Sequence, residues 1–181
     1  MDTRPTSDRL RETLFNVLAP RIQGSSVLDL YAGSGAVGLE ALSRAASRVE
    51  FVEKAPPALA ALKSNLARLA IAAGYKIHPA SVAATLRRLK SAPFDLVFLD
   101  PPYDAAEEYT ATLNFLGSSP SPLLAPHALV IAEHRKQDRL EDRYGALART
   151  RLLVQGDAAL SFYALDQPNP DSPSSTASGQ S

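Results

Sequence analysis

The sequence predicts an α/β domain with a mostly parallel, seven-stranded sheet, helices on both faces and a terminal antiparallel hairpin. Short apolar segments alternate with helical segments from residue 27 to residue 133, a pattern typical of parallel sheets. Two extended segments follow within 148–165, separated by a hairpin-type turn at 155–157. We expect one domain over 1–166 and a disordered tail over 167–181, which is rich in Pro and Ser and poor in apolar residues.

The predicted elements follow in the order that such a sheet requires. Residues 5–8 (Pro-Thr-Ser-Asp) are typical of a helix start, and apolar residues at helical spacing predict an opening helix that reaches Leu18. The same patterns predict strands at 27–30, 49–53, 75–78, 94–99 and 128–133, and helices at 36–42, 56–69, 82–89 and 107–116.

Composition narrows the class of protein. The 181 residues include no cysteine, which excludes a disulfide framework and a zinc–thiolate site, and the three histidines lack metal-ligand spacing. No apolar run approaches the roughly 18 to 20 residues of a membrane span, and no signal peptide is visible. We therefore expect a cytoplasmic monomer without metal or membrane contact. The formal net charge is zero, so any binding of nucleic acid must depend on a local basic patch.

A glycine-rich turn at 33–38 (Gly-Ser-Gly-Ala-Val-Gly) joins the first strand to a helix. Its glycines can take positive φ and let a ligand approach the backbone, and the helix start presents unpaired N–H groups. The spacing also matches the dinucleotide fingerprint, with Glu53 about 20 residues later. Asp29, however, would repel a pyrophosphate but not a zwitterionic amino acid, which argues against NAD. Glu53 ends a strand and can accept two hydrogen bonds from a ribose diol.

A second motif, Asp100-Pro101-Pro102-Tyr103, follows the apolar strand at 94–99 and faces the same crevice in a doubly wound sheet. An exocyclic amine on a base is a poor nucleophile because its lone pair is delocalised into the ring. Hydrogen bonds to the Asp100 carboxylate and the Pro101 carbonyl would localise that lone pair, and the prolines hold the loop rigid. Tyr103 offers a face on which an extruded base can stack.

These motifs resemble known families. The glycine turn resembles motif I of the Rossmann-like S-adenosylmethionine (SAM) methyltransferases, and Asp-Pro-Pro-Tyr resembles motif IV of the amino-group methyltransferases. With Arg4-Pro5-Thr6-Ser7-Asp8-Arg9 and Gly38-Leu39-Glu40-Ala41-Leu42, they resemble the RsmD family of bacterial small-subunit rRNA guanine-N2 methyltransferases over residues 3–165. The resemblance implies a class I methyltransferase fold, SAM as cofactor, and 16S rRNA, in the small subunit or an assembly intermediate, as partner.

The motifs and the resemblance together imply three sets of site residues. The catalytic residues would be Asp100, Pro101 and Tyr103. The cofactor would contact Asp29, Tyr31, Ala32, Gly33, Gly35, Glu53, Lys54, Ser81, Val82 and Asp100. The substrate would contact Pro102, Tyr103, Arg4, Arg9 and Arg11.

Three points stay open at this stage. The same Asp-Pro-Pro-Tyr chemistry would serve N6 of adenine in DNA, so the residues alone do not choose the base. Family members usually carry a basic segment ahead of Arg-Pro-Thr, whereas this chain starts almost at Arg4. We therefore expect weak binding to free RNA, and a SAM-binding, ribosome-associated module without strong catalysis is an alternative. The opening helix either packs on the domain or presents its arginines to phosphates.

Overall fold

The computed structural model describes residues 5–102, 105–118 and 121–166, so the predicted tail over 167–181 lies outside the described residues. The helices are α1 (Pro5–Ile22), α2 (Ala36–Ser43), α3 (Pro56–Arg68), α4 (Val82–Arg88) and α5 (Ala106–Leu116). The strands are β1 (Ser26–Leu30), β2 (Arg48–Val52), β3 (Tyr75–His78), β4 (Phe94–Leu99), β5 (Leu124–Arg135), β6 (Arg143–Tyr144), β7 (Leu147–Gln155) and β8 (Ala158–Leu165). No helix among the described residues is long and apolar enough to cross a lipid bilayer.

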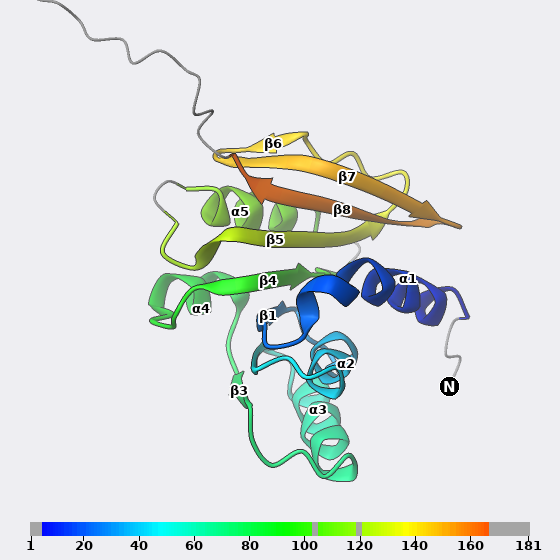
Figure 1. The fold of residues 1–181 in the computed structure, drawn as a ribbon, viewed down its shortest axis with the longest axis vertical. Coiled ribbons are helices and arrows are strands. Elements are labelled where there is room, and N and C mark those ends of the chain that lie inside the picture. Colours follow the sequence, from blue (N-terminus) through cyan, green and yellow to red (C-terminus); the bar gives the residue numbers. More distant parts are fainter. Residues whose placement is uncertain (1–4, 103–104, 119–120, 167–181) are drawn as a thin grey trace, which may run out of the picture.

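The strands form one eight-stranded sheet in the order β3-β2-β1-β4-β5-β8-β7-β6 (Figure 1). The first five strands in this order are parallel, and β8, β7 and β6 extend the sheet with antiparallel pairs. The α/β class and the terminal hairpin are confirmed, but the predicted count of seven strands is wrong. The additional strand is Arg143–Tyr144, and two residues are too few to show the alternation by which strands are recognised.

Helices cover both faces of the parallel part of the sheet because successive side chains along each strand point into different apolar cores. Leu28 and Leu99 lie in the core that α4 and α5 close. Val27, Phe98 and Ile131 lie in the core that α1, α2 and α3 close. Figure 1 shows the two groups of helices on opposite sides of the sheet. Burial on both faces is typical of parallel strands.

Helix α1 packs firmly on this sheet. Four of its apolar side chains are almost fully buried: Leu10, Leu14, Phe15 and Leu18. The helix continues beyond Leu18 to Ile22 and includes Pro20, so its predicted end is wrong by about one turn. A proline so close to the end of a helix removes one backbone donor and leaves the preceding turns intact.

The carboxyl ends of three neighbouring strands meet at one edge of the sheet. Leu30, the last residue of β1, pairs with Val52 of β2 on one side and with Leu99 of β4 on the other. The residues that follow these strand ends are therefore neighbours. This register brings the glycine turn, Glu53 and Asp100 to the same edge, which is where α/β sheets bind their ligands.

Candidate active site

A pocket of about 440 Å³ opens at this edge, which is within the size range of small-molecule sites. Several residues predicted to contact cofactor or substrate line it: Tyr31, Glu53, Lys54, Ser81, Val82, Asp100, Pro101 and Pro102. Asp29, Ala32, Gly33 and Gly35 lie beside the pocket and not among the residues that line it. Tyr103 and Arg4 are outside the described residues.

The glycine turn needs its glycines for two different reasons. Gly33 has φ +58°, and a Cβ added there would meet no atom within 4 Å, so its backbone borders open space. Gly35 has φ +86°, and an added Cβ would lie 2.3 Å from Cδ1 of the fully buried Leu62. Gly33 therefore suits close approach of a ligand. Gly35 is required by the packing of α3 against the turn, a reason that the sequence pattern does not reveal.

Asp29 stabilises the start of α2 from below the turn. Its Oδ2 accepts a hydrogen bond from the Gly38 N–H over 3.0 Å, and the residue is only 2% exposed. This burial raises the pKa of the Asp29 carboxyl to about 7, although the bond from Gly38 opposes the shift. The sequence suggested that Asp29 contacts the ammonium of a ligand. The observed geometry gives it a buried structural contact, and contact with a ligand stays a prediction.

Glu53 ties the end of β2 to the glycine turn. Its Oε2 accepts a hydrogen bond from the Gly33 N–H over 2.9 Å, and its Oε1 accepts bonds from the N–H groups of Lys54 and Ala55. A carboxylate has about four acceptor positions, so three are already used. The observed arrangement thus accommodates one hydrogen bond from a ribose hydroxyl, and the predicted second bond requires one backbone donor to move away.

Tyr31 connects the turn to α5 on the opposite wall of the pocket. Its hydroxyl donates to Glu108 Oε2 over 2.6 Å and lies 3.0 Å from Thr112 Oγ1. Burial, together with the neighbouring Glu108 carboxylate, raises the pKa of Tyr31 well above its usual value, so it stays a neutral donor. Glu108 itself lines the pocket. The sequence does not single out Glu108, because helical periodicity alone does not show which turn of α5 borders a ligand site.

Ser81 directly precedes α4 at the pocket. Its Oγ accepts a hydrogen bond from the Ala84 N–H over 3.3 Å, so the predicted cofactor residue also caps the helix. Val82 is buried beneath it, and Lys54 is exposed at the rim. In the absence of an acidic side chain at 80–82, this wall offers an apolar surface and backbone groups to a planar ring.

Asp100 and the two prolines form the wall nearest β4. Asp100 is open to solvent through the pocket, yet protein atoms crowd its carboxyl, and this desolvation raises its pKa to about 6. Pro101 is buried, and the Pro102 carbonyl accepts a hydrogen bond from the Ala105 N–H over 2.9 Å. At neutral pH Asp100 is therefore mainly a carboxylate that can accept hydrogen bonds from a substrate amine.

Glu133 lies next to Asp100 at the end of the neighbouring strand. Leu99, the last residue of β4, pairs with Ala132, so Asp100 follows β4 where Glu133 continues β5, and alternation places Glu133 on the face of the sheet that α1 covers. Burial and the Asp100 charge raise the pKa of the Glu133 carboxyl to about 8, although the Arg11 guanidinium opposes the shift, so Glu133 is mainly protonated at neutral pH. The sequence signal that could have identified Glu133 is an acid at the carboxyl end of an apolar strand.

The arginines of α1 fall into two environments. Arg9 is exposed, as a contact to phosphate requires. Arg11 is half-buried, bonds to Asp8 over 3.1 Å and lies close enough to Glu133 to affect its titration. Arg11 therefore pairs with Asp8 and lowers the pKa of Glu133, and its predicted RNA contact stays a prediction.

The described residues hold no group of three or more histidine, aspartate and glutamate side chains that could bind a metal ion. His134 is buried, with Nδ1 2.8 Å from the Arg135 carbonyl oxygen and Nε2 2.9 Å from Ser161 Oγ. This histidine joins β5 to β8, because both of its ring nitrogens are engaged by protein atoms.

The sheet order, the glycine turn and the pocket define a Rossmann-like domain of the class that SAM methyltransferases use. A family model described as Conserved hypothetical protein 95 matches residues 1–164, and the chain belongs to this family. The predicted resemblance to the RsmD family is confirmed by similarity to proteins named Ribosomal RNA small subunit methyltransferase D.

Among these relatives, the protein from Escherichia coli strain K12 is 38% identical over 162 residues, which are 88% of this chain and 78% of the relative. The protein from Haemophilus influenzae is 40% identical over 141 residues, 76% of this chain and 70% of the relative. The solved structure of yhhF from Escherichia coli superposes with a TM-score of 0.79 at 35% identity and covers 90% of this chain and 88% of that chain.

Proposed function

We propose that the protein transfers a methyl group from SAM to the exocyclic N2 of a guanine in 16S rRNA. The observation that carries this proposal is the placement of Asp100, Pro101 and Pro102 on the same pocket as Glu53, whose carboxylate bonds to the open backbone of Gly33 beside the pocket. Relatives similar over most of the chain are named as rRNA small subunit methyltransferases, which supports the substrate class.

Residues at three strand ends fit the cofactor. Glu53 would accept a hydrogen bond from a ribose hydroxyl, and the turn around Gly33 would border the amino acid end. Val82 and Ser81 would flank the adenine ring opposite Tyr31. When bound, SAM supplies an electrophilic methyl group attached to a sulfonium.

Asp100 would prepare the substrate amine for attack. Its carboxylate and the Pro101 carbonyl would accept hydrogen bonds from the two N2 protons, which localises the nitrogen lone pair. Tyr103, which lies outside the described residues, would stack on the extruded base. As the nitrogen–methyl bond forms and the carbon–sulfur bond breaks, one N2 proton would pass to Asp100.

The pairing of Asp100 with Glu133 favours guanine over adenine. Guanine presents two adjacent donors, N1–H and N2–H, whereas adenine presents the N6 donor beside the N1 acceptor. Two neighbouring carboxyl groups offer acceptors to both guanine donors, with Asp100 on N2 and Glu133 on N1. Burial and the Asp100 charge raise the pKa of Glu133 to about 8, so without cofactor its carboxyl is mainly protonated at neutral pH. The positive sulfonium of bound SAM would lower this pKa, and only the ionised Glu133 would repel N1 of adenine.

We further propose that the 1–166 unit works as a monomer in the cytoplasm, on the small ribosomal subunit or an assembly intermediate. A ribosomal RNA substrate implies this location. Methylation of adenine N6 in DNA is the alternative function of the Asp-Pro-Pro-Tyr motif, and only the ionised form of Glu133 argues against it. No observation favours a module without catalysis.

The substrate class can be tested with SAM carrying a labelled methyl group. Small subunits from cells that lack this enzyme, large subunits from the same cells and unmethylated DNA would be offered in parallel. We expect label in the small subunits alone. Label in DNA would overturn the proposal in favour of the adenine reading. Tight SAM binding without label in any substrate would favour the binding module.

A further inference from the structure

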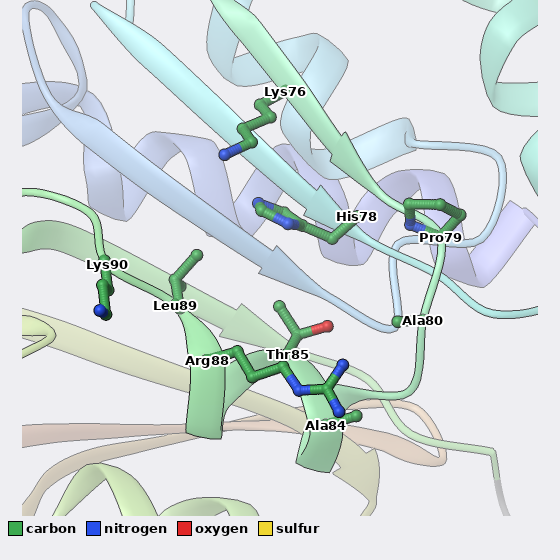
Figure 2. A pocket seen from close by; sticks show the side chains of 9 residues that line it. All are labelled: Lys76, His78, Pro79, Ala80, Ala84, Thr85, Arg88, Leu89 and Lys90. Atoms are coloured by element: carbon green, nitrogen blue, oxygen red, sulfur yellow. The ribbon is translucent and has the colours of Figure 1, made fainter.

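A second pocket, of about 350 Å³, lies between β3 and α4 (Figure 2). Lys76 and His78 come from β3, Arg88 from α4, and Lys90 from the segment that follows α4. No acidic side chain lines the pocket. The pocket is therefore lined by three permanently charged cations, Lys76, Arg88 and Lys90, on a protein whose formal net charge is zero.

The fold explains why these charges converge. Tyr75 and Ile77 pack into the core beneath α1, α2 and α3, so alternation turns Lys76 and His78 to the α4 face of the sheet. β3 is an edge strand, and it has no neighbouring strand on its outer side. Helix α4 ends at Arg88, and the chain turns back toward β4 past Lys90. A concave basic surface, here called the β3–α4 pocket, results.

The carboxylate of Glu50 on the neighbouring strand β2 already has partners in the protein. Glu50 lies opposite Lys76 in the register, but its Oε1 accepts hydrogen bonds from Arg48 and Ser91, each over 2.7 Å. Its Oε2 lies 2.6 Å from Nε2 of His78. Within the described parts of the chain, no ion pair engages Lys76, Arg88 or Lys90. The positive charge of this pocket is thus available to an external anion.

We propose that the β3–α4 pocket binds backbone phosphates of the RNA whose base enters the active site. The two pockets are contiguous, because Ala80 lines both, while Ala83 of α4 lines the first and Ala84 the second. A strand that crosses the mouth of the active site thus meets a basic recess next to it. Arginine and lysine are the side chains that bind phosphates, and this contact carries no sequence information. The inference rests on the proposed function and adds a second anchoring point for the substrate.

Helix α4 itself provides a matched control. Arg87 is exposed and directly precedes Arg88, yet it does not line the pocket. Arg87→Ala and Arg88→Ala thus each remove one positive charge from the same helix, but only Arg88 lines the pocket. Lys76→Ala removes a pocket charge from a different element and tests whether β3 takes part.

The experiment is filter binding of a protein-free 16S rRNA fragment across a salt series, with SAM affinity measured by calorimetry for each variant. Arg88→Ala and Lys76→Ala should each lower the slope of log affinity against log salt by about 0.7 to 0.9, the value for one phosphate contact. Arg87→Ala should leave the slope near that of the unmodified protein. SAM affinity should remain unchanged in all three variants.

Equal salt slopes of RNA binding for Arg87→Ala and Arg88→Ala would overturn the inference. The effect of an arginine on RNA binding would then not depend on whether it lines the pocket. Altered methylation of whole subunits by Arg88→Ala, without altered binding of bare RNA, would also overturn it and indicate an acidic protein partner. The experiment distinguishes a failure of this inference from a failure of the proposed function. If no substrate accepts a methyl group while the slopes differ as expected, the phosphate pocket stands and the methyl-transfer proposal does not.

Discussion

The N–H of Gly33 donates a hydrogen bond to Oε2 of Glu53 over 2.9 Å and joins the glycine turn after β1 to the end of β2. Through this contact a single carboxylate arranges the backbone that would border the amino acid end of SAM and also faces the pocket where the ribose would lie.

Glu53→Ala should weaken SAM binding by about 1.5 to 3 kcal/mol, the usual contribution of a hydrogen bond to a charged group. The loss combines the ribose contact with the loosened Gly33 N–H. Calorimetry of SAM binding measures it. Glu53→Gln retains one acceptor oxygen and should lose less. SAM affinity equal to that of the unmodified protein in Glu53→Ala would contradict the ribose role.

Gly33→Ala should weaken SAM binding beyond its effect on stability. Gly24 provides the control, because it also has positive φ (+75°, against +58° at Gly33) and an added Cβ meets nothing within 4 Å at either site. Both substitutions should cost about 1 to 2 kcal/mol of stability through left-handed strain. Urea unfolding checks this cost. Only Gly33→Ala should lower SAM affinity. Equal SAM affinity of the two variants would contradict binding of SAM against the Gly33 backbone.

Asp29 should make the protein less stable as pH rises. Its folded pKa of about 7 lies above the ordinary 3.8, so between these values the folded protein holds a proton that the unfolded chain has released. The free energy of unfolding therefore falls across this window, by about 1.4 kcal/mol for each pKa unit of difference. Asp29→Asn keeps an acceptor for the Gly38 N–H but cannot titrate.

Urea unfolding of both proteins at about pH 4 and about pH 8 measures this effect, with pH values set by the ordinary and folded pKa. Asp29→Asn should gain stability relative to the unmodified protein between these two values. The Asp100 and Glu53 charges contribute to the shift of Asp29, so the comparison measures the titration of Asp29 together with its coupling to these carboxylates. Parallel curves of stability against pH would show that the Asp29 carboxyl is not protonated in the folded state.

Arg9→Ala should lower the salt slope of RNA binding by about one unit and leave SAM affinity unchanged. Arg9 is exposed on the first turns of α1, whereas the exposed Arg21 at the other end of α1 donates to the His127 carbonyl over 2.9 Å. Arg21→Ala is therefore the control, and its slope should not change. An unchanged slope for Arg9→Ala would make α1 a packing element alone.

The sequence predicts the parts of the site that depend on strand ends. Glu53 and Asp100 each follow an apolar strand, and parallel topology then requires both to meet the glycine turn. What it does not predict depends on packing between distant segments. The contact of Gly35 with Leu62, the burial of Asp29 and the partnership of Tyr31 with Glu108 join separate elements, and no local pattern encodes them.

The central claim is that the neighbouring carboxyls of Asp100 and Glu133 direct methylation to N2 of guanine. The most direct test is identification of the labelled nucleoside, by digestion and mass spectrometry, after reaction of small subunits that lack the modification. We predict N2-methylguanosine with the unmodified protein, little product with Asp100→Ala, and loss of the guanine preference with Glu133→Gln. Label in N6-methyladenosine with the unmodified protein would contradict the account.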